Sequence, residues 1–280
     1  MRIGLVQEIK VGKWNSMLGQ EDITAIIALS LEQLSEKIAG FSLVPMRIES
    51  RLDMALFRIY FTSCWLEVYD KVSLNPLPRV LEIAPGQFDP IPQSLEIASS
   101  GSGEYFTANL NRQLSARLRE NTKALNITVK VIEDNALNLR NHLREQYFDL
   151  IGFQHAINDI IQGIIADKNG VDTTGTDWFE ILPRLIEGVV KYSSQDKLEE
   201  AAYREFIDII EVAYSLLKPS GYMIFNNHIF KLDLDYGAPL DLYSSFIQIA
   251  KDWITTAGLK LSLVEFPGFD PKWWLFLQKD

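Results

Sequence analysis

Cysteine is almost missing from this sequence, because Cys64 is the only one among 280 residues. An intrachain disulfide is therefore impossible, and a zinc site built on cysteines is nearly so. Residues 1–20 also lack the basic segment, the long apolar run and the small-residue cleavage site of a signal peptide. These absences predict a cytoplasmic protein without a metal site.

Long apolar runs and an excess of basic charge are missing as well. The most apolar helical stretch, residues 54–72, contains Arg58, Glu67, Asp70 and Lys71, which makes it a poor membrane span. Lysine and arginine total 27 against 37 aspartates and glutamates, so the net charge is -10. Proteins that neutralise nucleic-acid phosphates carry the opposite balance. Neither a membrane nor a nucleic acid is expected as a partner.

Two helical patterns fill the first quarter of the chain. Apolar residues recur at helical spacing over 23–38, between the N-cap candidate Asp22 and Gly40, which predicts one helix. Ser50 and Asp53 resemble a capping box for a second helix over 51–72. The prolines of 75–78 then break the chain. We therefore expect an N-terminal helical segment over 1–76 and a main domain over 77–280.

From residue 79 onward, short apolar runs alternate with amphipathic helices, which indicates βαβ units and an α/β fold with a mostly parallel sheet. Helices are expected after the strand ends, and one long insertion, 156–198, separates the fourth and fifth strands. The last two strands are joined by only six residues, too few for a crossover helix, so they should pair antiparallel. The expected strands are 80–83, 105–108, 128–132, 150–153, 222–226, 259–266 and 273–278.

The turn after the first strand has the features of a ligand site. In a doubly wound sheet, small residues at a strand's carboxyl end let the backbone approach a ligand, and the next helix offers unpaired amides. Ala84 and Gly86 supply the small side chains in the stretch RVLEIAPGQFD at 79–89. This stretch resembles the first motif of class I S-adenosylmethionine-dependent methyltransferases, an acidic residue followed by alternating glycines. Glu82, Ala84, Gly86 and Phe88 stand at those positions.

Further blocks resemble later motifs of the same family, in the family's order. In YFTANLN at 105–111, Asn109 stands where the family has an acid on the ribose hydroxyls. VIEDNAL at 131–137 resembles the adenine-binding turn, with Asn135 at the acidic position and Ala136 offering its backbone amide. FDLIGF at 148–153 and LLKPSGYMIF at 216–225 resemble the fourth-strand and fifth-strand motifs. Leu110 and Phe153 are apolar residues placed to flank a flat base.

The resemblance implies a Rossmann-like fold with seven strands, a cofactor site for S-adenosylmethionine, and methyl transfer to a small molecule enclosed by the N-terminal segment and the insertion. It departs from the family at Phe88, Asn109 and Asn135, and a neutral asparagine lacks the charge-assisted bonds of an acid. Asp134 or Glu82 can carry part of the lost role. The alternative is a methyltransferase-like binding or partner protein without transfer activity. A nicotinamide-dependent oxidoreductase is weaker still, because Gly-x-Gly-x-x-Gly is absent.

Two histidines are candidates for a general base. His155 follows the fourth strand and His228 the fifth, so both should lie at the ligand-binding edge of the sheet. Asp159 lies four residues past His155 and can orient it along one helix face. The structural alternative is that neighbouring polar groups simply satisfy both histidines. No Asn-Pro-Pro-Tyr type motif follows the fourth strand, so O-methylation is expected rather than methylation of a base or glutamine nitrogen.

Overall fold

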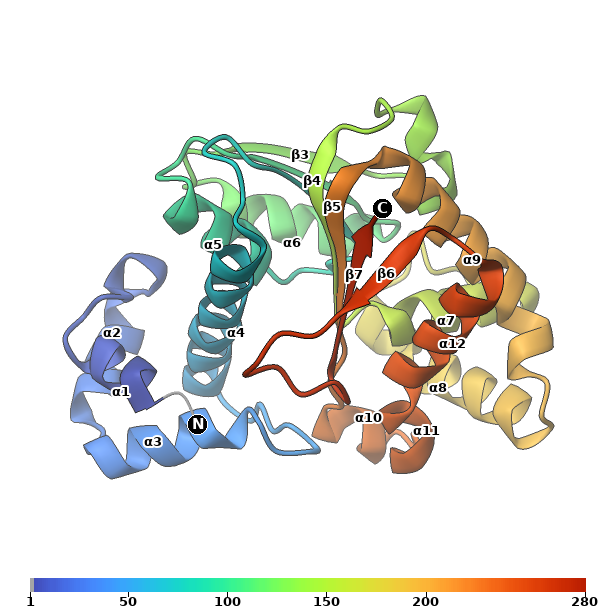
Figure 1. Ribbon diagram of the computed structural model, residues 1–280. Helices are drawn as coiled ribbons and strands as arrows, with labels where there is room; N and C mark the ends of the chain where they lie inside the picture. Colours follow the sequence, from blue (N-terminus) through green and yellow to red (C-terminus); the bar gives the residue numbers. More distant parts are fainter. Residues whose placement is uncertain (1–2) are drawn as a thin grey trace.

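A seven-stranded sheet runs through the computed structural model in Figure 1, which describes residues 3–280. The strand order is β3-β2-β1-β4-β5-β7-β6. Strands β1 to β5 pair in parallel, whereas β7 is antiparallel to both β5 and β6. The predicted α/β sheet with an antiparallel C-terminal pair is confirmed. The strands are β1 (Arg79–Ile83), β2 (Glu104–Ala108), β3 (Thr128–Ile132), β4 (Phe148–Gln154), β5 (Leu217–Asn226), β6 (Leu261–Val264) and β7 (Trp274–Lys279).

Helices cover both faces of this sheet (Figure 1). On one side lie α4 (Arg51–Val72) and α5 (Pro90–Ala98), which pack closely on each other. On the other lie α7 (Ile157–Lys168), α9 (Leu198–Leu216) and α12 (Phe246–Ala257). Helix α6 (Arg112–Thr122) connects β2 to β3. Burial of the inner strands between two helical layers explains why they read as apolar runs, whereas the edge strands β3 and β6 are partly exposed.

The register brings the strand ends to one level, where a ligand site belongs. Ile83 pairs with Ala108, and Ala108 pairs with Ile132, so β1, β2 and β3 end side by side. The sheet order reverses between β1 and β4, and the crevice outside the carboxyl ends of strands at such a switch point is the usual ligand position in open α/β sheets. Ala84 and His155 leave β1 and β4 at this crevice.

The N-terminal segment differs from expectation in one place. The single helix expected before Gly40 is two helices, α2 (Gln20–Ala28) and α3 (Leu31–Gly40), after a first helix α1 (Ile3–Lys10) and a short 3-10 turn η1 (Asn15–Met17). The break lies at Ser30, which is the N-cap of α3. Its side chain accepts from Gln33 N, and the Gln33 side chain accepts from Ser30 N, so the two residues form a capping box. The second helix begins and ends as predicted, and Ser50 accepts from Asp53 N.

Three other regions complete the fold. The helix expected after Ala136 is only a 3-10 helix, η2 (Ala136–Asn141). The insertion contains α7 and α8 (Trp178–Ser194), joined by the loop 169–177. Residues 227–258, for which the sequence suggested no element, form α10 (Lys231–Asp235), α11 (Leu240–Ser244) and α12. No helix in residues 3–280 is long and apolar enough to cross a membrane.

Candidate functional site

Two cavities meet at the carboxyl edge of the sheet. The first, about 330 Å³, lies over the ends of β1, β2 and β3 and is called the β1–β3 cavity. The second, about 320 Å³, lies over the end of β4 beside α10 and is called the β4–β5 cavity. Both volumes are at the lower end of the range for small-molecule sites. The two share a wall, made of Ala84, Gly86, Leu114, Asp159 and Trp178.

The turn after β1 forms much of this shared wall because its backbone is left-handed at two positions. Ala84 has φ 54° and Gly86 has φ 60°. A Cβ added at Gly86 would meet only Leu114 Cδ1, at 3.8 Å, so the protein leaves that space open toward the cavities. Asn109, at the end of β2, donates from Nδ2 to Gly86 O at 2.7 Å, which leaves its Oδ1 to accept from a ligand.

The β3 end of the cavity contains three of the predicted binding residues. Asn135 Oδ1 accepts from Leu137 N at 3.0 Å and so caps η2, of which Ala136 is the first residue. The N–H of a first helical residue has no partner inside its helix, so the Ala136 amide can donate to a ligand. Asp134 lines the cavity, but its carboxylate accepts from Asn138 and contacts His142 Nε2 at 2.8 Å. Its oxygens are therefore already engaged.

Two predicted cofactor residues lie away from both cavities. Glu82 is 1% exposed and its carboxylate accepts from Tyr105 OH at 2.6 Å. Its pKa is raised to about 8, mainly by burial; the Tyr105 bond opposes the rise and the Asp89 carboxylate adds to it. Phe153 is fully buried and stacks on Phe225 with ring centroids 4.4 Å apart. Neither side chain lines a cavity, so the structure gives neither a direct contact with a ligand. Leu110, by contrast, does line the β1–β3 cavity.

The lining of the β1–β3 cavity is acidic. Five carboxylate side chains line it, namely Asp134, Asp159, Asp167, Asp172 and Glu205. Among the described residues, no lysine, arginine or histidine lines it. Such a lining opposes the pyrophosphate of a dinucleotide and suits a ligand with net positive charge. S-adenosylmethionine, with a sulfonium and an ammonium against one carboxylate, fits this requirement.

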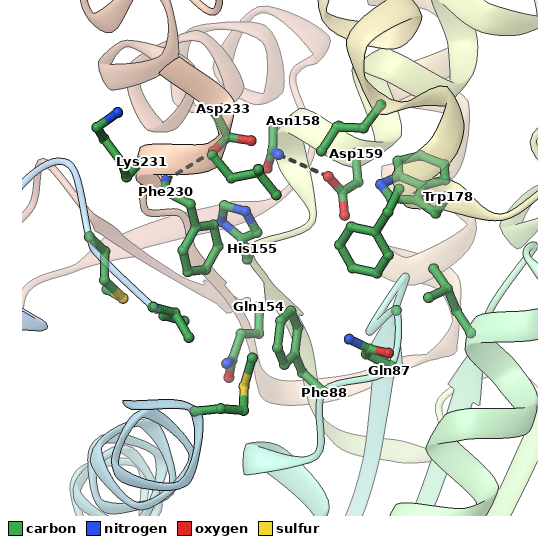
Figure 2. Close-up of a pocket in the computed structure, with 18 of the residues that line it drawn as sticks. Gln87, Phe88, Gln154, His155, Asn158, Asp159, Trp178, Phe230, Lys231 and Asp233 are labelled. Carbon is green, nitrogen blue, oxygen red and sulfur yellow. Dashed lines mark hydrogen bonds between the residues drawn. The ribbon is translucent and has the colours of Figure 1, made fainter. Parts of the chain in front are cut away.

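Apolar and polar side chains both line the β4–β5 cavity, and Figure 2 shows Asp233, Asn158 and Asp159 in a row along one part of it. Apolar side chains from the N-terminal segment, the β1 turn and the loop after β5 form one group; they are Met46, Ile48, Met54, Phe88 and Phe230. Gln154, His155, Asn158, Asp159 and Asp233 form the other, called the polar wall. Asn158 Nδ2 donates to Asp159 Oδ1 at 2.8 Å, and Asp233 Oδ2 accepts from Phe230 N at 2.9 Å.

The two candidate histidines have different positions. His155 lines the β4–β5 cavity with a left-handed φ of 53°, and its Nδ1 lies 3.4 Å from His228 N. Burial, with a smaller effect of His228, lowers the pKa of His155 to about 3, so it is neutral and weakly basic at neutral pH. His228 lies outside the cavity lining, stacked on Trp273, with its Nε2 3.1 Å from Asn226 Nδ2. His228 is packed against Phe61 and Trp273, but its Nδ1 is buried without a hydrogen-bond partner among the described residues, so its role as a general base stays a prediction.

The insertion contributes lining residues to both cavities. Trp178 lines both cavities and Phe179 lines the β4–β5 cavity. The preceding loop is held over α6, because Asn111 Nδ2 donates to the carbonyls of Thr173 and Thr176. Sequence reasoning pointed to both aromatic residues, but it missed the α10 residues of the opposite rim. The acidic pattern KLDLD at 231–235 was the available signal.

No cluster of three or more histidine, cysteine or acidic side chains in residues 3–280 is placed to hold a metal ion.

Comparison with known proteins gives architectural neighbours only. No family model matches the chain, and no curated protein matches it. A SAM-dependent methyltransferase from Aquifex aeolicus is 12% identical over 76% of this chain and 86% of its own, with a TM-score of 0.47. A methyltransferase from Pyrococcus furiosus is 14% identical over 88% and 95%, with a TM-score of 0.43. The chain has a Rossmann-like fold, as its strand order and antiparallel C-terminal pair show. What this protein does has to be argued from its own residues.

Proposed function

We propose that this chain is an S-adenosylmethionine-dependent methyltransferase that acts on a small molecule. The β1–β3 cavity would hold the cofactor and the β4–β5 cavity the acceptor. The observation that carries the proposal is the shared wall of Ala84, Gly86, Leu114, Asp159 and Trp178. In-line transfer needs two ligands in contact and aligned. Two adjoining cavities that meet at one turn support such an arrangement.

The residues of the β1–β3 cavity match what the cofactor needs. Gly86 leaves room for it, Asn109 Oδ1 can accept from a ribose hydroxyl, and the Ala136 amide can donate to the adenine. When bound, S-adenosylmethionine supplies an electrophilic methyl group: the acceptor lone pair forms the new bond to carbon, and the bond to sulfur breaks with its electron pair left on a neutral thioether. Trp178 would shield this junction from water.

The acceptor is proposed to be small and uncharged or cationic. Acidic side chains line the β4–β5 cavity at Glu49, Asp159, Asp233 and Asp235, which would repel a polyanion such as a nucleic acid. The sequence favoured an oxygen acceptor because no Asn-Pro-Pro-Tyr type motif follows the fourth strand and because two histidines were candidates for a general base. The argument from a histidine base weakens here, since the pKa of His155 is lowered to about 3. We propose that His155 positions the acceptor and does not take its proton.

Calorimetric titration tests the cofactor assignment. We expect one S-adenosylhomocysteine site per chain and no binding of NAD, since the acidic lining opposes a pyrophosphate. Absence of any S-adenosylhomocysteine binding would contradict the proposal. Binding without conversion of S-adenosylmethionine in the presence of a broad set of acceptors would instead support the silent, methyltransferase-like alternative. That alternative has one structural argument, which is that Asn135 Oδ1 is already engaged by Leu137 N.

A further inference from the structure

The polar wall of the β4–β5 cavity is made almost wholly of hydrogen-bond acceptors. Asp159 and Asp233 supply carboxylates, and Asn158 lies next to them in Figure 2. Asn158 is 2% exposed, its Nδ2 is used on Asp159, and its Oδ1 has no hydrogen-bond partner in the described part of the chain. Buried polar atoms are nearly always paired, so an orphan acceptor between two carboxylates indicates a missing donor.

The charges of this wall are not balanced by the protein. Lys231 is the one lysine or arginine among the described residues that line the cavity, and it is paired with Asp235 one turn further along α10. Asp159 receives a hydrogen bond only from a neutral amide, and burial together with the Asp233 carboxylate raises its pKa well above the ordinary value. Burial likewise raises the pKa of Asp233 to about 6. Carboxylates in this state lack a counter-charge.

We propose that the acceptor molecule is an amine, which binds as an ammonium among Asp233, Asn158 and Asp159 with its apolar body against Phe88, Phe230 and Met54. Before transfer the ammonium gives one proton to the Asp159 carboxylate, and the lone pair freed on nitrogen then forms the bond to the methyl carbon. This rests on the proposed function, and it names the substrate class. An ammonium has donors and no acceptor, so it matches all three groups at once. Charge-assisted bonds to the carboxylates make it preferable to an alcohol of the same shape. The aromatic side chains of Phe88 and Phe230 in the same cavity fit a hydrocarbon or aromatic body.

Matched ligands test the charge preference. Three bodies (indolylethyl, phenylethyl and hexyl) would each be titrated as the amine, the alcohol and the one-carbon-longer carboxylic acid, with and without saturating S-adenosylhomocysteine. For the best-bound body we expect the amine to bind about tenfold or more tighter than its alcohol, with the acid weakest. An alcohol or acid that binds as tightly as its amine, or amines that bind nowhere, would overturn the proposal.

Asp233→Asn locates the preference in this cavity. Asparagine keeps an acceptor for Phe230 N but removes the charge, and Asp233 does not line the β1–β3 cavity. We expect the variant to lose about tenfold in amine affinity while its affinities for the alcohol and for S-adenosylhomocysteine stay within about twofold. Asp241→Asn, an exposed change of the same charge on α11, is the control and should alter nothing. An unchanged amine preference in Asp233→Asn would refute the assignment, whereas failure of S-adenosylhomocysteine to bind wild type would refute only the cofactor proposal.

Discussion

Glu82 gives the sharpest test of how the structure places the acid of the first motif. Its carboxyl is fully buried against Tyr105, and its pKa is raised from an ordinary 4.5 to about 8. Between these values the unfolded chain has lost the proton that the folded chain keeps. The folded state therefore binds more protons, and its stability falls as pH rises through this window. Above pH 8 the penalty is complete.

The magnitude follows from the size of the shift. One pKa unit corresponds to about 1.4 kcal/mol, so from pH 5.5 to 7.5 the Glu82 contribution should reduce the free energy of unfolding by about 2–3 kcal/mol. Glu82→Gln removes the titration and keeps an acceptor for Tyr105 OH. The free energy of unfolding of the variant minus that of the wild type should therefore rise by about 2–3 kcal/mol from pH 5.5 to 7.5. Urea unfolding at several pH values measures it.

A matched control comes from the same sheet. Glu104 accepts from Tyr147 OH at 2.6 Å, the same bond as Glu82 to Tyr105, but its side chain is 34% exposed. Glu104→Gln makes the same carboxylate-to-amide change at this partly exposed position and is measured alongside as the control. A flat difference curve for Glu82→Gln would refute the burial argument. A loss of more than about tenfold in S-adenosylhomocysteine affinity would show that Glu82 belongs to the binding site after all.

Three further outcomes are expected. Gly86→Ala should abolish measurable S-adenosylhomocysteine binding in calorimetry, whereas Gly258→Ala, which has the same left-handed strain at the end of α12, should leave it intact. Asn109→Ala should weaken that binding by about tenfold, the value of one neutral hydrogen bond; an unchanged affinity would contradict the ribose assignment. In the wild type, Arg58 Nε donates to the Asp89 carboxylate at 2.8 Å, and Asp89 is 1% exposed. Arg58→Met leaves this buried carboxylate without its cation and should reduce the free energy of unfolding, measured in urea, by about 3 kcal/mol.

The sequence was enough to predict the sheet because its signals are local. The inner strands are apolar runs ended by a small or polar residue. Asn111 begins α6 by accepting from Gln113 N and Leu114 N, as expected of an N-cap. The break between α2 and α3 was missed because the apolar periodicity continues across it. Ser30 and Gln33 have the sequence pattern of a capping box, which was the signal for the break. Where periodicity and a cap conflict, the cap decided the boundary.

The direction of side chains could not be predicted in the same way. Glu82 and Ile83 are neighbours on β1 and point to opposite faces, and both are buried. Only the structure shows that Ile83 lines the β1–β3 cavity while Glu82 points to Tyr105 on the next strand. The β4–β5 cavity depends on contacts between distant segments. Met46 N donates to Ile229 O, and Lys231 N donates to Met46 O, so the N-terminal segment and the α10 loop meet at the rim. No local pattern predicts that contact.

The position of Asp159 connects the two proposals physically. A sulfonium in one cavity and an ammonium in the other would repel each other, by about 4 kcal/mol for unit charges 4 Å apart in a protein environment with an effective dielectric constant near 20. Asp159 is the one charged side chain that lines both cavities in the described part of the chain. A single carboxylate there attracts both cations and offsets their repulsion. Without ligands the pKa of Asp159 is raised, because its buried negative charge has no cation beside it. Binding of the two cations would supply the missing positive charge.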